Sequence, residues 1–211
     1  MKAARSGDYY QANRTFRDLL KTCSDWGLVY LQLGVLELDT NPSPQEAIKL
    51  LTKATELLPT NPRAHFHLAA AHAATTDYNQ ALKHIAKAIE LRPKYAQAHQ
   101  KKAIFHEQNG QLEQAIATLE NLLSFKRKHT AAMAELARLY ELNGQAELSE
   151  AKYRALLDRE PNVYFHWLSF GQFLRRQGKH IEARKAFKKA DTLKPRPRRK
   201  LRPLLPSSDV R

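Results

Sequence analysis

Small residues recur along the chain at a nearly constant interval. The interval is 35 residues once and 34 residues thereafter, at Ala12, Ala47, Ala81, Ala115, Ser149 and Ala183. A period of this length fits two antiparallel helices with their turns. A small residue at one place in each period indicates where two helices cross closely. The pattern therefore predicts a linear array of helix pairs.

Large apolar residues follow each small residue by one helical turn, which places both on the same helix face. They are Phe16, Leu51, Ile85, Leu119, Tyr153 and Phe187. A second set of small residues marks the expected crossing point on the other helix of each pair: Gly34, Ala69, Ala103, Ala137 and Gly171. Four repeats end at a proline, which cannot continue a helix: Pro59, Pro93, Pro161 and Pro195. This register predicts eleven helices and no strand, near residues 8–23, 26–39, 44–57, 62–75, 78–91, 96–109, 112–125, 130–143, 146–159, 163–177 and 180–193.

The last period resembles the tetratricopeptide repeat. The matching residues are Trp167, Phe170, Gly171, Leu174, Gly178, Ala183, Phe187, Ala190 and Pro195. The resemblance implies an all-α fold in which helix pairs wind into a right-handed superhelix, and it implies a binding scaffold without naming the partner.

We expect a repeat array over residues 1–195 and a flexible, proline-containing basic tail over 196–211. The array would hold a partial first repeat at 7–25 and full repeats near 26–60, 61–95, 96–129, 130–163 and 164–195.

Two departures from the pattern carry expectations of their own. Arg127 stands where other repeats have proline, so we expect a longer helix or looser geometry there. Gly7 is expected to form a turn, which leaves the first repeat with almost no first helix. Tyr9, Phe16 and Leu19 would then lie partly uncovered, and we expect them to form a self-association surface.

Composition agrees with a helical array outside the membrane. Apolar residues make up 43% of the chain, and no run approaches the ~18 apolar residues that span a bilayer. The start shows no secretory signal. The single cysteine, Cys23, cannot form an internal disulfide. These features favour a cytoplasmic protein.

The charge of the chain is strongly positive, at +14. Five cations dominate the tail: Arg196, Arg198, Arg199, Lys200 and Arg202. Such a tail either binds nucleic acid or acidic lipid, or it is a solvated end that keeps the protein soluble. Because no aromatic residue lies among these cations, stacking on single-stranded nucleic acid is not indicated.

The sequence gives no sign of catalysis, and we expect neither an enzyme nor a metal or other cofactor. It has no glycine-rich phosphate loop, no helical His-Glu-x-x-His and no elbow serine. His65 and His72 are seven residues apart, as are His99 and His106. That spacing is about 10 Å along a helix, too far for two ligands of one metal. These places belong to Trp and Tyr in the repeat pattern, so we interpret the histidines as packing residues.

The expected binding surface is the concave face, lined by the first helix of each repeat. Its candidate partner-binding residues are Leu31, Val35, Arg63, Phe66, His67, Gln97, Gln100, Lys101, Glu135, Arg138 and Arg175. They are apolar toward the amino end and mixed or basic beyond it, which suits an extended or helical peptide. Alternatively, part of this apolar surface packs within the chain, at the place of the first helix that the first repeat lacks. The lysines, arginine and asparagines with which one branch of the resembled family grips a terminal carboxylate are not present as a set.

The sequence therefore favours a non-catalytic scaffold that binds a protein or peptide, and two alternatives stay open. One is a structural protein that assembles as a homo-oligomer through its incomplete first repeat, as some organelle- and pilus-associated members of the resembled family do. The other is an adaptor that uses the basic tail to bind nucleic acid or an acidic surface.

Overall fold

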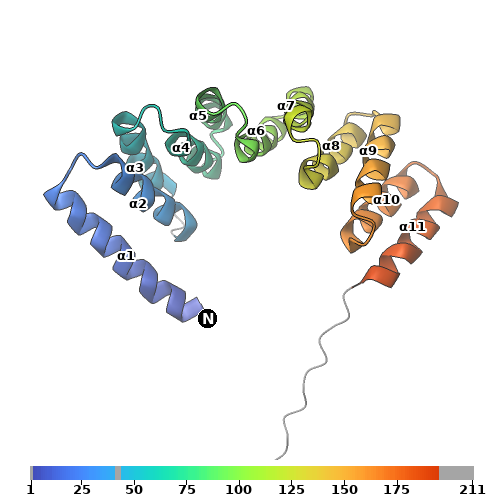
Figure 1. Ribbon diagram of the computed structural model, residues 1–211, viewed down its shortest axis with the longest axis horizontal. Coiled ribbons are helices and arrows are strands. Elements are labelled where there is room, and N and C mark those ends of the chain that lie inside the picture. The colour runs from blue at the N-terminus through green and yellow to red at the C-terminus, as the bar shows by residue number, and fades with distance from the viewer. Residues whose placement is uncertain (1, 41–43, 195–211) are drawn as a thin grey trace, which may run out of the picture. The chain divides into compact units, whose positions relative to one another are not determined.

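The structure is a computed structural model that describes residues 2–40 and 44–194 of the chain. All regular structure in these residues is helical, and eleven helices follow one another in the predicted order (Figure 1). They are α1 (Lys2–Thr22), α2 (Gly27–Thr40), α3 (Pro44–Leu57), α4 (Pro62–Ala74), α5 (Tyr78–Leu91), α6 (Ala96–Gln108), α7 (Leu112–Phe125), α8 (Thr130–Leu142), α9 (Ala146–Arg159), α10 (Tyr164–Arg176) and α11 (His180–Leu193).

The chain divides into two compact units, Met1–Lys152 and Tyr153–Arg211, with the boundary inside α9. In the first unit, α2 packs on α3, α4 on α5 and α6 on α7, and each pair contacts the next. In the second unit, α10 packs on α11. Each of these pairs is one helical repeat, as the sequence period predicts.

The close helix crossings lie at the predicted small residues. A Cβ atom added to Gly34 would meet Leu51 Cγ at 2.6 Å, and one added to Gly171 would meet the Phe187 ring at 2.7 Å. Ser149 Oγ donates a hydrogen bond of 2.8 Å to the carbonyl oxygen of Ala137. In each pair the partners belong to the two helices of one repeat, which confirms the register.

Four described turns inside the repeats contain a residue with positive φ at the same place. Gly110, Gly144 and Gly178 have φ values of 73°, 75° and 75°, in the left-handed region that glycine adopts easily. Thr76 holds the corresponding place with φ 60°. A β-branched residue is strained in this region, so the turn between α4 and α5 stores strain that the others avoid.

The expected turn at Gly7 and the expected longer helix at Arg127 are wrong, and the looser geometry at Arg127 stays a prediction. Gly7 lies inside α1, which begins at Lys2. A glycine within a helix costs only ~1 kcal/mol relative to alanine and does not by itself end the helix. Helix α7 ends at Phe125, with the same length as α5, although Arg127 replaces proline. Helix α8 follows closely and limits the length of α7. His129 caps α8, because its Nδ1 accepts the backbone N–H of Ala132.

Candidate functional site

The first helices of two successive repeats, α4 and α6, are placed side by side by the aromatic residue that precedes α6. Asn61 begins α4, since its side-chain oxygen accepts the N–H of Arg63 at 2.9 Å, and Pro62 occupies the first turn. The Tyr95 ring, 9% exposed, lies 5.2 Å from that of Phe66 on α4. The start of α6 is thereby fixed against α4.

A groove runs between these two helices. It is lined by Arg63, Phe66, His67, Tyr95, Gln97, Gln100, Lys101 and Ile104. Six of these residues are among those predicted from the register to line the binding surface: Arg63, Phe66, His67, Gln97, Gln100 and Lys101. The structure thus brings together the middle part of the predicted set.

The polar side chains of the groove are free to meet a ligand. Gln97, Gln100 and Lys101 form no side-chain hydrogen bond or ion pair with the residues that the structure describes. Ile104 is 39% exposed and, with Phe66, supplies apolar surface. Burial and then the charge of Arg63 lower the pKa of His67 below its usual value, so its imidazole is neutral near pH 7. Amides, apolar surface and cations can bind a chain but do not form a catalytic set.

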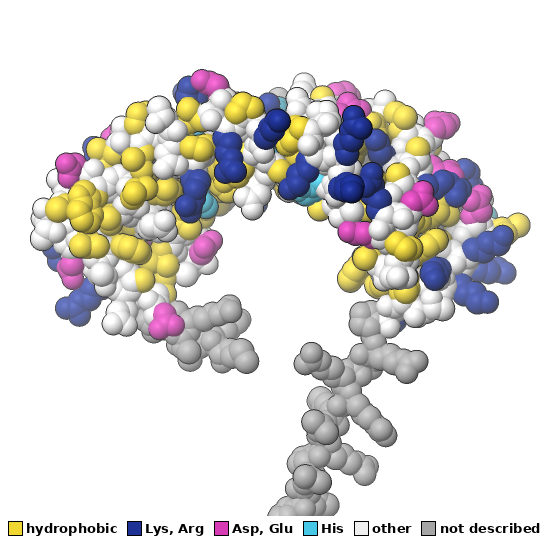
Figure 2. Space-filling view, in the orientation of Figure 1, with side chains coloured by type: hydrophobic (Ala, Val, Ile, Leu, Met, Phe, Trp, Pro, Cys, Tyr) yellow, Lys and Arg dark blue, Asp and Glu magenta, His cyan; other side chains and the backbone are white. Residues whose placement is uncertain are grey.

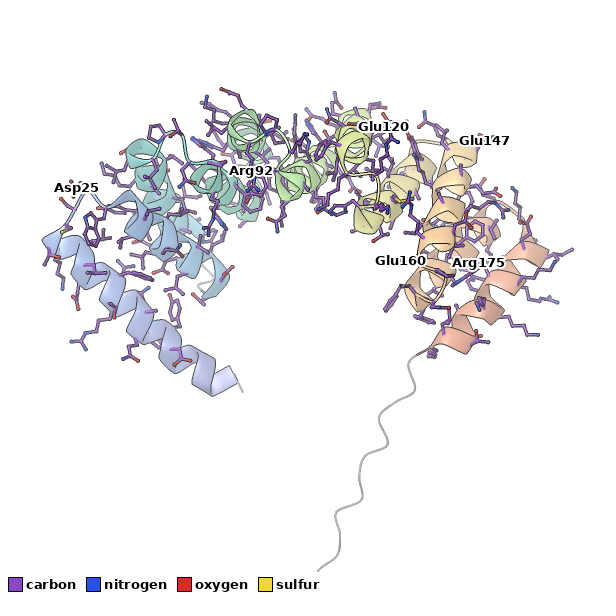
Figure 3. The ribbon with its side chains drawn as sticks, in the orientation of Figure 1. Asp25, Arg92, Glu120, Glu147, Glu160 and Arg175 are labelled. Atoms are coloured by element: carbon purple, nitrogen blue, oxygen red, sulfur yellow. The ribbon has the colours of Figure 1, made fainter. Side chains whose placement is uncertain are left out.

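One rim of the groove carries a cation stacked on an aromatic ring. The Arg92 guanidinium lies 5.0 Å from the centroid of the Tyr95 ring, at the connection between α5 and α6 where Figure 3 labels it. Sequence reasoning missed both residues. The available signal was an aromatic residue at a helix-start place that Asn61 and His129 occupy in neighbouring repeats.

The predicted binding residues on α2 and α8 do not line this groove. The assignment of Leu31 to the binding surface is wrong, because Leu31 is 1% exposed and packs with Leu51 and Leu68 in the core. Val35 is half-buried against the same cluster. Arg138 forms ion pairs with both Glu107 and Glu135, which raise its pKa and hold the three side chains together.

The remaining candidate residues fall outside this groove. Arg175 belongs to the second unit, where its guanidinium lies 6.0 Å from the Phe187 ring centroid. The tail residues Arg196, Arg198, Arg199, Lys200 and Arg202 lie outside the described residues.

Helix α1 packs on α2 through a buried carboxylate that sequence reasoning did not identify. Glu37 is 2% exposed and accepts hydrogen bonds from Tyr9 Oη, Asn13 Nδ2 and Arg17 Nη2 at 3.2, 2.7 and 3.0 Å. Of the proposed self-association residues, Tyr9 is engaged in this contact, and Phe16 and Leu19 are half-buried. Helix α1 therefore has a packing partner in α2, while these three residues are partly exposed, as expected from the sequence.

Two of the four histidines interpreted as packing residues, His65 and His99, are buried and make a specific hydrogen bond. Nε2 of His65 and of His99 lies 3.0 and 2.8 Å from the carbonyl oxygens of Pro59 and Pro93. Trp167 Nε1 donates the same bond to Pro161 at 2.7 Å. Within the described residues, no group of three or more His, Cys, Asp or Glu is placed to hold a metal ion.

The fold defines a helical repeat protein of the solenoid class. Models of the tetratricopeptide repeat match residues 43–105, 72–129, 101–164 and 134–196. Because these matches together span more than half of the chain, the protein belongs to the tetratricopeptide repeat family.

Solved structures of the same fold are similar throughout much of the chain. MamA (residues 41 to end) from Desulfovibrio magneticus RS-1 aligns with a TM-score of 0.70 and 22% identity, over 79% of this chain and 94% of that one. A tetratricopeptide repeat protein from Parabacteroides merdae gives 0.76 and 17%, over 92% and 76%. YrrB, which is described as having an unusual peptide-binding site, gives 0.67 and 15%, over 84% and 91%. A comparison with curated proteins found no match to the sequence.

Tetratricopeptide repeat proteins typically mediate protein–protein interactions and are generally not catalytic. None of the helices in the described part of the chain combines the length and apolarity needed to cross a bilayer.

Proposed function

We propose that this protein is a non-catalytic cytoplasmic scaffold that binds an extended segment of a partner protein in the groove between α4 and α6. The observation that carries the proposal is the lining of the groove. It combines solvent-facing amides and cations, which have no partner among the described residues, with the apolar surface of Phe66 and Ile104.

An extended segment fits this lining because its backbone presents N–H and C=O groups along its length. Gln97 and Gln100 are three residues apart on α6, so their amides lie on one helix face and can pair with successive backbone groups. An apolar side chain of the segment would rest on Phe66 and Ile104. Such anchors supply most of the free energy in peptide recognition.

The test is selection of peptides from a random display library on the immobilised full chain. Peptides that bind the wild type are then measured against Ile104→Glu, which places a charge on the groove floor. Ile181→Glu is the matched control, because Ile181 is an exposed isoleucine on α11 outside the groove. We expect loss of binding only in Ile104→Glu. Equal binding by both variants, or no selected peptide above background, would contradict the proposal.

A second candidate function is self-association through the amino-terminal helices. Large apolar side chains are exposed there, namely Tyr10 (73%), Trp26 (50%) and Leu28 (59%). Apolar exposure of this kind is common at association sites. Light scattering over a range of concentrations should show assembly that Leu28→Asp abolishes while helicity is retained. A mass that stays monomeric at the highest concentration would reject this function.

A further inference from the structure

Three exposed cations meet at the groove. Arg63 and Lys101 line it directly, and Arg92 joins its rim by stacking on Tyr95. None of the three forms an ion pair with a residue in the described part of the chain. No Asp or Glu lines the groove to balance them. Asp39 on α2 is close enough for its charge to act on His67, so the groove has an excess of positive charge beside its apolar floor rather than positive charge alone.

The positive charge extends from the groove along two neighbouring connections between repeats. The connection from α5 to α6 contains Arg92 and Lys94, and that from α7 to α8 contains Lys126, Arg127 and Lys128. All five side chains are exposed, and neither connection contains an acidic residue. Figure 2 shows the Lys and Arg side chains, in dark blue, gathered over the helices from α4 to α8. We call Arg92, Lys94, Lys126, Arg127 and Lys128 the basic connections.

Among the described connections between repeats, such a run of cations is specific to these two. The corresponding places are Leu58, Pro59 and Thr60 before α4, and Glu160, Pro161 and Asn162 before α10. The same backbone turn thus forms with neutral or acidic residues. The basic side chains are not required by the fold of the connection.

Favourable interaction with a helix C-terminus accounts for Arg92 and Lys126 but not for Lys94 and Lys128. Arg92 and Lys126 follow the last residues of α5 and α7, where a cation interacts favourably with the terminal carbonyl groups. Lys94 and Lys128, by contrast, lie immediately before Tyr95 and His129, the N-cap residues of α6 and α8. The dipole of each helix is positive there, and the first turns of α6 and α8 contain no acidic residue. These two lysines are repelled in the free protein, and a bound anion would relieve the repulsion.

The chemistry of the groove favours an acidic polypeptide over a single-stranded nucleic acid. Nucleic acid of that kind needs open aromatic faces on which bases stack. Tyr95 is only 9% exposed, with Phe66 and Arg92 against its ring. The floor instead offers the half-buried ring of Phe66, one aliphatic side chain and two amides, which match a polypeptide better than a row of stacked bases.

We propose that the groove and the basic connections together bind an acidic segment of a partner protein. One apolar side chain of the segment rests on Phe66 and Ile104, and its flanking Asp and Glu residues pair with Arg63, Arg92 and Lys101. Acidic residues further along the segment reach Lys94 and the cations at 126–128. This inference rests on the proposed function, since it names the class of partner that the same groove takes.

The first experiment reads the composition of the displayed peptides whose binding to the full chain is lost in Ile104→Glu. We expect Asp and Glu to be enriched at least ~2-fold over the starting library on both sides of an apolar residue. If such peptides are found but are neutral or basic, this inference fails while the proposed function stands. If no peptide depends on Ile104, the proposed function itself fails.

The second experiment separates the groove from general positive charge. One variant carries Arg63→Glu, Arg92→Glu and Lys101→Glu. The control carries Lys185→Glu, Lys188→Glu and Lys189→Glu on α11, where all three lysines are exposed, and lowers the net charge equally. With a selected acidic peptide at ~0.15 M salt, we expect the groove variant to lose at least ~10-fold in affinity and the control less than ~3-fold. Equal losses would overturn the inference, because a diffuse field would then explain binding.

A third arm tests the nucleic-acid alternative. A single-stranded oligothymidylate is added as competitor to the bound acidic peptide. We expect it to displace the peptide only at concentrations far above those of unlabelled acidic peptide. Displacement at equal or lower concentration, lost in the groove variant, would overturn the inference in favour of nucleic acid.

Discussion

Nε2 of His99 lies 2.8 Å from the carbonyl oxygen of Pro93, the proline that ends the preceding repeat. A carbonyl oxygen only accepts, so His99 carries a proton on Nε2 and donates the bond. His65 and Trp167 make the same contact to Pro59 and Pro161. The fifth repeat has Met133 and Arg127 at these places, so it lacks the side-chain donor and the proline, although Arg127 still has a main-chain carbonyl. An N–H donor on the first helix and the preceding proline therefore occur together.

Replacing His99 by phenylalanine should destabilise the protein. The change keeps an aromatic ring against Phe125, 5.2 Å away, but leaves the Pro93 carbonyl without this donor. We expect a loss of ~1 kcal/mol, the usual net value of one hydrogen bond. Urea unfolding measures it. Met133→Leu is the control at the equivalent place without a donor, and an equal loss there would show that packing alone matters.

Acidification should destabilise the protein through the His84 side chain. Its ring stacks between those of His65 and His72, with centroids 5.8 and 5.6 Å away. Burial, and then the charges of His72, His65 and Lys83, lower the pKa of His84 to about 4. The unfolded chain has a histidine pKa near ~6.5 and binds the proton first.

Stability is therefore complete above pH ~6.5 and falls as the pH decreases toward ~4, by about 1–2 kcal/mol for this partly solvated ring. Urea midpoints at several pH values measure the slope, and His84→Gln should flatten it. An unchanged slope in the variant would assign the acid sensitivity to other groups.

Removing the cation beside Glu37 should loosen α1. Arg17→Ala leaves a carboxylate that is 3% exposed without this ion pair, whose N···O distance is 3.0 Å. Since Arg17 is itself 46% exposed, we expect a loss of ~1–3 kcal/mol. Hydrogen exchange should accelerate in α1 and remain unchanged in α4–α7. Arg14→Ala is the control, because Arg14 is 87% exposed and pairs only weakly with Asp18 at 3.9 Å.

Adding a methyl group at Gly171 should disturb the pairing of α10 with α11. The new Cβ would lie 2.7 Å from the Phe187 ring, so we expect Gly171→Ala to cost ~1–3 kcal/mol. The better helix propensity of alanine offsets at most ~1 kcal/mol of this. In a Phe187→Ala background the clash is absent, and the same change should become neutral or stabilising. A cost that persists in that background would show that the ring does not set the limit.

Relieving the strained turn before α5 should stabilise the protein. Thr76 has φ 60°, which costs an L-residue ~1–2 kcal/mol and glycine little. After the greater freedom of glycine in the unfolded chain is included, we expect Thr76→Gly to add ~0.5–1 kcal/mol. The reciprocal change Gly110→Thr should destabilise. Thermal midpoints that move in the opposite directions would contradict the conformational argument.

The predicted binding surface was recovered only in part. Inward places on α4 and α6 follow from helical periodicity, so Arg63 and Lys101 could be assigned from their numbers alone. Leu31 holds the place on α2 that Phe66 and Gln100 hold on α4 and α6, and it lies in the core, whereas those two are only half-buried. Periodicity gives the face of a helix on which a residue lies, but burial depends on what the neighbouring helices cover.

The sequence by itself determined the repeat register and almost all the helix boundaries, because the contacts within each helix pair are local and recur with a fixed period. It also determined the crossing points, since a glycine or alanine at a fixed place is what lets two helices approach. Tertiary structure determined the contacts that the repeat period does not specify. It alone stacked Arg92 on Tyr95 at the rim of the groove and buried Glu37 beneath Tyr9, Asn13 and Arg17. The Glu37 contacts join side chains from different repeats, and the Arg92–Tyr95 pair is set at the groove by the packing of Tyr95 on Phe66 of α4, so both depend on how successive helices pack.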